Sequence, residues 1–184
     1  MQFVEVLGFQ GIAYFGTSYF YWFLEVCSGT AILTQAVRYV GLTALEPVDL
    51  LTGWDLTKQS CCLRLKARIR EWRPLYTHFA PKCRIFSQAY RPRCPPEEYQ
   101  ERDDYKQTMC LALNIADLAA FCHRLKIFVS IEDPIASRIY NLPQYRYIHD
   151  NAGFFFVDAH MCMFVHVYQM RTKYEVRSTA YTMY

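Results

Sequence analysis

The sequence contains little charge, no paired-cysteine motif, and no repeated or low-complexity tract. Charged residues make up 20% of the 184 residues, and 20 basic against 17 acidic side chains leave a net charge of +3. Such an excess does not by itself identify a nucleic-acid-binding protein. None of the eight cysteines shows Cys-x-x-Cys spacing, which argues against a zinc knuckle. We interpret most of them as reduced thiols of an intracellular protein, several buried as small apolar groups.

Apolar and aromatic side chains are abundant instead. Hydrophobic residues make up 53% of the chain and aromatic residues 17%. This content can offset the chain entropy lost on folding, which excludes a disordered protein. The length fits one globular domain.

The amino-terminal part contains an uncharged run at 6–24, close to the length of a membrane span. No Lys or Arg precedes the run, as a secretory signal requires, and Glu5 stands directly before it. The run includes several glycines and polar residues, and its second half is rich in Tyr and Phe rather than Leu. We therefore expect an aromatic-rich extension at 1–20 in a protein that is not secreted and has no membrane partner, followed by one core at 21–184.

Short apolar runs alternate with helical spacing in this core. The expected strands are Tyr21–Val26, Leu42–Val48, Leu75–Ala80, Ile127–Ile131, Phe154–Val157, His160–Val167 and Tyr174–Val176. The expected helices are Ala31–Val40, Thr57–Trp72 and Tyr105–Leu125, with a loop from 81 to about 101. The side chains expected to face inward are Ile32, Leu33, Ala36, Val37 and Val40 in the first helix, and Met109, Leu113, Ala116 and Ala120 in the third.

Strands separated by helices predict an α/β fold. Right-handed crossovers favour a three-layer αβα sandwich with a mostly parallel, doubly wound, Rossmann-like sheet. Ligands bind such sheets at the carboxyl ends of the strands, so the loops after the strands are the candidate site.

The first two of these loops carry residues suited to a nucleotide-type cofactor. Residues 25–31 read Glu-Val-Cys-Ser-Gly-Thr-Ala, and such small residues let a cofactor approach the backbone and the helix amino terminus. A purely structural turn favours the same residues. Asp49 follows the second strand, where ribose hydroxyls are held in such folds. Asp55 suits that role or the role of a helix cap.

The third loop carries the most specific motif. Residues 78–89 read His-Phe-Ala-Pro-Lys-Cys-Arg-Ile-Phe-Ser-Gln-Ala. This segment closely resembles the catalytic loop of cytosine-C5 DNA methyltransferases, Pro-Pro-Cys-Gln-x-Phe-Ser-x-Ala. The residues that match in order are Pro81, Cys83, Phe86, Ser87 and Ala89.

Other segments resemble motifs of the same family in the same order. Glu25–Ala31 resembles Asp-Leu-Phe-x-Gly-x-Gly, with Gly29 matched, and 53–57 resembles Gly-Asp-Ile-Thr with one residue inserted. Ile131–Pro134 resembles the Glu-Asn-Val motif that follows a strand, and Gln169–Lys173 resembles Gln-x-Arg-x-Arg. The resemblance covers nearly everything from residue 23 to 176.

The resemblance implies a methyltransferase core that transfers a methyl group from S-adenosyl-L-methionine to carbon 5 of cytosine in nucleic acid, DNA rather than RNA. Cys83 would be the nucleophile, Glu132 the acid on the Watson–Crick edge, and Arg171 the contact to the ring oxygen. Lys82, Arg84 and a nearby helix amino terminus would favour the thiolate, and a base in a duplex would have to be flipped out. The residues implied for the cofactor are Glu25, Cys27, Ser28, Gly29, Thr30, Asp49, Asp55 and Pro81.

The sequence departs from the family at several places. Lys82 replaces the second proline beside the nucleophile, and Asp133 replaces the asparagine of Glu-Asn-Val. The family's target-recognition domain and final Gly-Asn motif are not among the 184 residues. We expect a partner protein to supply target recognition.

Two other interpretations compete. The first is a structural zinc site, for which the candidate ligands are Cys83, Cys94, Cys122, His123, His160 and Cys162. The second is a catalytically inactive interaction domain with a methyltransferase fold, from a viral or mobile-element protein. Binding of S-adenosyl-L-methionine separates this second interpretation from the enzyme.

Overall fold

The computed structural model describes residues 21–87, 95–134, 136–160 and 171–177. The predictions made for residues 1–20, for 161–167, for Ala89 and for Gln169 lie outside these ranges. The helices are α2 (Ile32–Tyr39), α3 (Gln59–Trp72), α4 (Pro96–Glu101), α5 (Asp103–Arg124) and α6 (Pro143–Ala152). The strands are β1 (Phe23–Val26), β2 (Tyr76–Phe79), β3 (Phe128–Pro134), β4 (Phe154–His160) and β5 (Arg171–Arg177). Short 3₁₀ turns lie at Leu50–Thr52, Arg84–Phe86 and Arg138–Asn141.

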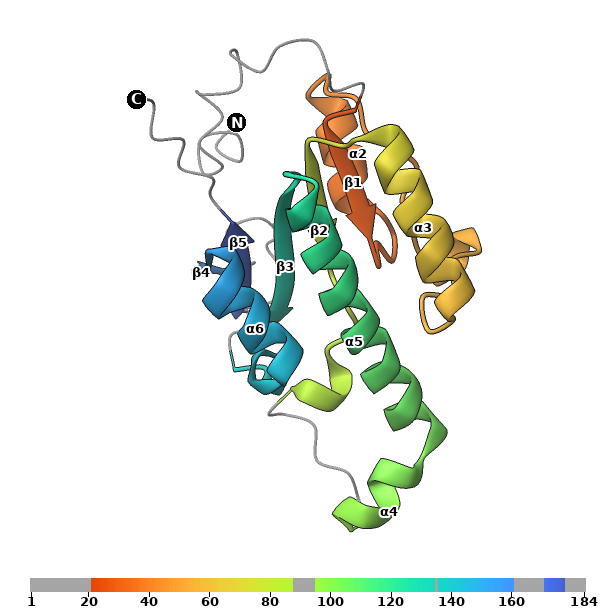
Figure 1. The fold of residues 1–184 in the computed structure, drawn as a ribbon, viewed down its shortest axis with the longest axis vertical. Helices are drawn as coiled ribbons and strands as arrows, with labels where there is room; N and C mark the ends of the chain where they lie inside the picture. Colours follow the sequence, from red (N-terminus) through yellow and green to blue (C-terminus); the bar gives the residue numbers. More distant parts are fainter. Residues whose placement is uncertain (1–20, 88–94, 135, 161–170, 178–184) are drawn as a thin grey trace.

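The strands form one sheet in the order β1-β2-β3-β5-β4 (Figure 1). β1, β2 and β3 pair in parallel, whereas β5 is antiparallel to both β3 and β4. The predicted strand Leu42–Val48 pairs with β1 only through two isolated bridges, at Ala44 and Val48. Pro47 has no N–H to donate, so a continuous ladder cannot form there.

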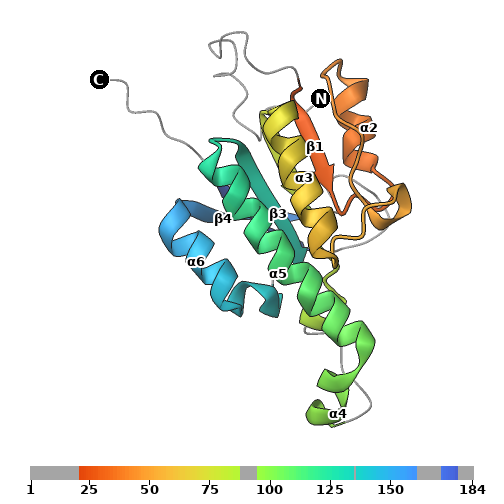
Figure 2. The same cartoon turned by 45° about the vertical axis from the view of Figure 1, so that its right-hand side comes forward.

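The helices lie on both faces of the sheet. The Cys122 side chain of α5 lies on the Thr77 side of β2, and α3 contacts α5 through the ion pair of Lys66 with Asp117. Thr34 of α2 instead contacts Glu25, which points to the opposite face because side chains alternate along a strand. Accordingly, α3, α5 and α6 cover one face, and α2 covers β1 from the other (Figures 1 and 2).

Local sequence explains where the helices begin and end. Asp103 and Asp104 open α5, while His123 and Arg124 close it, so that the charges complement the helix dipole. Pro143 starts α6, and Gly153, in a left-handed conformation with φ 65°, ends it. The α5 face of the sheet packs into the main core with α3, α5 and α6. This core includes Leu24, Val26, Leu65, Phe79, Ile115, Leu118, Val129, Ile131 and Ile148.

The predicted helix faces are partly wrong. In α2, Ile32 and Val40 are exposed and Thr34 is buried instead. Glu25 accepts hydrogen bonds from Thr34, which turns that side of the helix to the sheet. In α5 only Ala116 of the expected set is fully buried. The buried positions include Ala112, Ile115 and Ala119, because apolar residues surround much of this helix.

Two element boundaries also differ from the prediction. The expected loop up to residue 101 contains α4, whose Pro-Glu-Glu start is a helix signal. β3 continues to Pro134, so Glu132 and Asp133 lie in the strand and not after it. Pairing of β3 with β5 extends the strand over these residues.

The described residues thus form an α/β fold with a three-stranded parallel part, compatible with a Rossmann-like fold. On the second face only α2 is present among them, so a complete three-layer sandwich is not shown.

Candidate functional site

A topological switch point lies at the carboxyl end of β1. From β1 the chain passes to the Ala44–Val48 segment on one edge of this strand, and then returns through α3 to β2 on the other edge. In open α/β sheets, ligands bind in the crevice that such a reversal leaves. The loop after β1 therefore occupies the position that topology alone assigns to a ligand.

This first loop has an unusual backbone. Cys27, Gly29 and Ala31 have φ angles of 60°, 52° and 55°, a region that residues with a side chain rarely adopt. The N–H of Gly29 donates to Oδ2 of Asp49 (3.0 Å), and Oδ1 of Asp49 accepts from the N–H of Leu51 (2.9 Å). Asp49 therefore holds the loop in place, a role that the sequence did not predict for it.

Open space and an unsatisfied hydroxyl adjoin this loop. Gly29 and Thr30 are exposed, and no heavy atom lies within 4 Å of the point where a Cβ of Gly29 would stand. Oγ of Ser28 is buried without a hydrogen-bond partner among the described residues. Buried polar groups are normally paired, so an unpaired hydroxyl beside open space is what a ligand-binding loop provides.

The carboxylate of Glu25 serves the helix that follows. Its Oε2 accepts from the N–H of Thr34 (2.7 Å) and from the hydroxyl of the same residue (2.5 Å). Ala31 precedes α2 without a side-chain cap, so Glu25 supplies the missing acceptor from the strand. Cys27 is half-buried. Its burial, and then the charge of Asp49, raise the pKa of its thiol to about 12.

Asp55 takes the role of a helix cap among the described contacts. Its Oδ1 accepts from the N–H (3.1 Å) and the hydroxyl (2.5 Å) of Thr57, and Lys58 forms an ion pair with it at 3.1 Å. The hydrogen bond from Thr57 is the main cause that lowers the pKa of Asp55. Of the two aspartates, Asp49 is thus the one beside the first loop.

The loop after β2 presents Cys83 between two exposed cations. Pro81 is buried, Lys82 and Arg84 are exposed, and Cys83 is half-buried. The carbonyl of Cys83 accepts from the N–H groups of Phe86 and Ser87, both at 2.9 Å. Two buried side chains, Ile85 and Phe86, anchor this turn to the core.

The electrostatic setting of Cys83 contradicts one expectation. Burial, and then the charges of Asp133 and Glu132, raise the pKa of its thiol, whereas Lys82 and Arg84 were expected to lower it. Both cations point into solvent, where their effect is screened, and the carboxylates are partly or fully buried. The same interaction places Cys83 beside Glu132 and Asp133.

The two carboxylates at the end of β3 have different environments. Glu132 is 19% exposed, and its Oε2 lies 3.4 Å from Nε2 of His78. Asp133 is 1% exposed, on the other face, and neither of its oxygens has a hydrogen-bond partner among the described residues. Burial raises the pKa of Asp133 to about 7. The nearby Ser137 hydroxyl opposes this shift, and Glu132 adds to it.

Arg171 is the first residue of β5, and its backbone lies at the same edge of the sheet. It pairs with His160 of β4, and the next residue, Thr172, pairs with Pro134 of β3. The side chain of Arg171 lies outside the described part. The structure thus places Cys83 in the loop after β2, Glu132 in the neighbouring strand β3, and the backbone of Arg171 near the end of β3.

The sequence analysis missed His78 and Ser130. Both are buried in β2 and β3, directly opposite each other in the ladder, and Nδ1 of His78 lies 2.7 Å from Oγ of Ser130. Each is a polar residue inside an otherwise largely apolar strand, which was the available signal.

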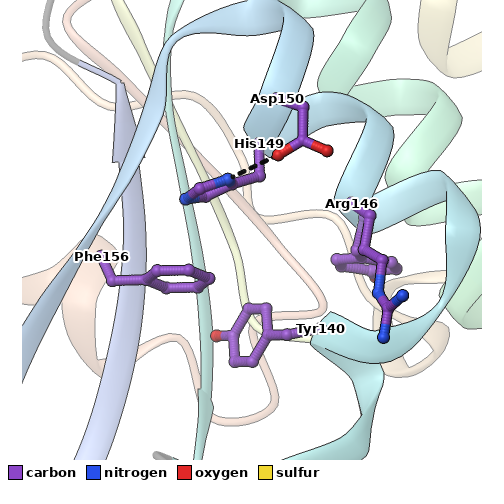
Figure 3. Close-up of a pocket in the computed structure, with 6 residues that line it drawn as sticks. Tyr140, Arg146, His149, Asp150 and Phe156 are labelled. Carbon is purple, nitrogen blue, oxygen red and sulfur yellow. Dashed lines mark hydrogen bonds and ion pairs between the residues drawn. The ribbon is translucent and has the colours of Figure 1, made fainter.

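A shallow pocket of about 100 Å³ lies elsewhere, between α6 and β4 (Figure 3). The rings of His149 and Phe156 stack at 4.8 Å between centroids, and Tyr140 meets Phe156 edge-on at 5.3 Å. These aromatic rings pack against one another. None of the predicted site residues lines the pocket.

The described ranges were also searched for metal sites and membrane spans. They contain no group of three or more His, Cys, Asp or Glu side chains placed to hold a metal ion. The six cysteines within them are free thiols, and Cys62 and Cys122 are buried. The other zinc candidates, Cys94, Cys162 and the side chain of His160, lie outside this part. No helix in the same ranges has the length and apolar character needed to cross a bilayer.

No protein-family model matches the chain, and no curated protein matches its sequence.

Proposed function

We propose that the chain is an S-adenosyl-L-methionine-dependent methyltransferase-like domain that methylates carbon 5 of cytosine in nucleic acid, DNA rather than RNA. The observation that carries this proposal is that Cys83 follows β2 and Glu132 lies in the neighbouring strand β3, both toward the carboxyl edge of the sheet, where the charge of Glu132 acts on the thiol. The loop after β1 lies at the same edge, because β1, β2 and β3 are parallel neighbours. A thiol, an acid and a switch-point loop therefore stand together.

The first loop fits the cofactor. The unpaired hydroxyl of Ser28 and the open space at Gly29 leave room for a polar ligand against the backbone. Asp49 stands after the second predicted strand, where ribose hydroxyls are bound in folds of this kind. When bound, the cofactor supplies the methyl group that carbon 5 receives.

The chemistry assigned to the chain's own residues is covalent. The thiol of Cys83 gives its proton to a neighbouring carboxylate, and its sulfur forms a bond to carbon 6 of the ring. Glu132 holds a proton at ring nitrogen 3, which stabilises the charge that develops there. After methylation, solvent water takes the proton from carbon 5, and the electron pair of that bond re-forms the double bond between carbons 5 and 6 as the bond between sulfur and carbon 6 breaks. The released thiolate then recovers its proton from the carboxylate that took it.

Positive charge around Cys83 supports a nucleic-acid substrate. Lys82 and Arg84 flank the thiol and are exposed, and so is Arg138, from the turn after β3. A guanidinium nitrogen of Arg138 donates to the carbonyl of Ile85 (3.3 Å), which holds it beside the Cys83 turn. Exposed basic side chains at this edge suit phosphate contacts, which position a nucleic acid without reading its sequence.

A trapping experiment tests the proposal. Wild-type protein and the Cys83→Ala variant are incubated with S-adenosyl-L-methionine and an oligonucleotide that contains 5-fluorocytosine. The fluorine at carbon 5 of this base cannot be removed in the way that the proton of cytosine is, so the covalent adduct persists. We expect a stable covalent adduct with the wild type and none with Cys83→Ala. Cys61→Ala removes another half-buried thiol, from α3, and should trap normally. Equal trapping by Cys83→Ala and wild type would refute the assignment of the nucleophile.

A second candidate function is the inactive interaction domain. One observation favours it: burial and two carboxylates raise the pKa of the Cys83 thiol, so the thiolate is scarce at neutral pH. Calorimetry with S-adenosyl-L-methionine and with its demethylated product separates the two functions. Binding of either ligand supports the enzyme, and absence of binding at millimolar concentration supports the inactive domain.

A further inference from the structure

Polar side chains on the α2 face of β2 and β3 form one continuous chain of contacts. Oγ of Ser130, in β3, lies 2.7 Å from Nδ1 of His78, in β2. On the other side of the same ring, Nε2 lies 3.4 Å from Oε2 of Glu132. His78 is 3% exposed and Ser130 is 1% exposed, so protein surrounds the middle of this chain.

The carboxylate of Glu132, at the end of this row of contacts, determines which group donates each hydrogen bond. An ionised carboxylate can only accept hydrogen bonds, so Nε2 of His78 carries the proton that faces Glu132. In a neutral imidazole Nδ1 is then an acceptor, and the hydroxyl of Ser130 donates to it.

Burial also decides against a different arrangement. Serine, histidine and glutamate in contact suggest a hydrolytic triad, in which the serine oxygen attacks a substrate carbonyl. The hydroxyl of Ser130 is engaged by His78, and its residue is 1% exposed. No substrate carbonyl reaches it. Glu132, at 19% exposed, is the member of the chain that meets solvent.

We infer that His78 is a positioning residue for Glu132, whose carboxylate holds the ring in one tautomer while Ser130 engages the other ring nitrogen. The contact from Nε2 fixes one carboxyl oxygen of Glu132 and leaves the other for the substrate. This inference rests on the proposed function, in which Glu132 holds a proton at the ring. The contact at 3.4 Å is long for a hydrogen bond, and catalytic contacts of this kind tighten when the substrate binds.

The tautomer of His78 is measured first, because this readout needs no substrate. In the ¹⁵N spectrum of the full chain at neutral pH we expect His78 to be protonated at Nε2 and bare at Nδ1. Glu132→Gln should give a mixture of tautomers, because an amide can donate or accept, and Ser130→Ala should shift the Nδ1 signal. The inference would be overturned by a proton on Nδ1 in the wild type, or by ¹⁵N signals of the His78 ring that neither substitution changes.

The rate of adduct formation is measured second. We expect His78→Gln to slow trapping on the 5-fluorocytosine oligonucleotide by about 10- to 100-fold, because a misplaced catalytic group costs this much. His149→Gln is the matched control. His149 also contacts a carboxylate, Asp150 at 3.1 Å, but on the exposed side of α6, so trapping should not change. Ser130→Ala, which keeps the histidine, should slow trapping less.

The outcomes keep the two proposals apart. Trapping by His78→Gln at the wild-type rate overturns the positioning role while the proposed function stands. A wild-type chain that forms no adduct overturns the proposed function, and with it the catalytic purpose of the contact. In that case the tautomer of His78, measured from the ¹⁵N spectrum, still supports or overturns the contact between His78 and Glu132.

Discussion

The two faces of the sheet are built from the same three parallel strands, yet their side chains differ in kind. The face toward α3, α5 and α6 carries mainly apolar residues, including Leu24, Val26, Phe79, Val129 and Ile131. The face toward α2 alternates with it and carries the polar set Glu25, Tyr76, His78, Ser130 and Glu132, together with Phe23 and Phe128. Because successive side chains of a strand point to opposite faces, apolar packing and polar contacts lie on opposite sides of the same strands.

The difference has a physical cause. Buried polar groups must be paired, so each residue of the polar face has a specific partner: Thr34 for Glu25, and His78 for both Ser130 and Glu132. Apolar residues need only volume and contact. The apolar face therefore stabilises the fold, and we assign the chemistry to the polar face and the adjoining edge.

Truncation of the apolar face should give the largest loss of stability. Phe79→Ala removes a fully buried ring, and we expect the free energy of unfolding to fall by about 3 to 5 kcal/mol. Ser130→Ala, at the polar face of the neighbouring strand, should cost only about 1 to 2 kcal/mol. Urea unfolding of both variants measures this comparison. Equal losses would remove the distinction between the faces.

Asp133 is the charged exception on the apolar face, and its effect should depend on pH. Its raised pKa means that the folded chain binds this proton more tightly than the unfolded chain between about pH 4 and pH 7. The stability that Asp133 contributes is therefore complete below this window and is lost as the pH rises through 7.

Asp133→Asn should remove this loss. We expect the variant to match the wild type near pH 4 and to exceed it by on the order of 3 kcal/mol at pH 8. Unfolding free energies across this range measure the difference. A constant difference at every pH would show that Asp133 ionises normally. The variant should also lower the pKa of the Cys83 thiol, since it removes the nearest negative charge.

A smaller effect is expected where the polar face meets α2. Thr34→Val keeps the shape of the side chain but removes the hydroxyl that donates to Glu25. We expect a loss of about 1 to 2 kcal/mol, because a buried carboxylate loses one of its donors. Thr57→Val, at the half-buried contact with Asp55, should cost less. A larger loss at Thr57 would reverse the expected order.

Much of the fold could be predicted from the sequence, because its signals are local. The apolar runs of β1, β2 and β3 and the long helix α5 lie where propensity and periodicity put them. The inward faces of α2 and α5 could not be read in the same way. Thr34 is buried because Glu25, nine residues away, accepts its hydrogen bonds, and this contact leaves no periodic signal.

The candidate site was predictable where a motif marks it. Cys83 and Glu132 were chosen from sequence, and they lie in the loop after β2 and in the neighbouring strand β3, toward the same edge of the sheet. His78 and Ser130 were missed, because their meeting depends on the register of β2 against β3. The predicted effect of charge on the Cys83 thiol was also wrong. The residues next to Cys83 in the sequence are cations, whereas the charges that shift its pKa are carboxylates.

The most direct test of the account is the identity of the methylated product. The full chain is incubated with S-adenosyl-L-methionine that carries a labelled methyl group and with an oligonucleotide that contains cytosine, and the digested nucleosides are separated. The account predicts labelled 5-methylcytosine with the wild type and none with Cys83→Ala. Label on another atom, or equal label with both proteins, would contradict it.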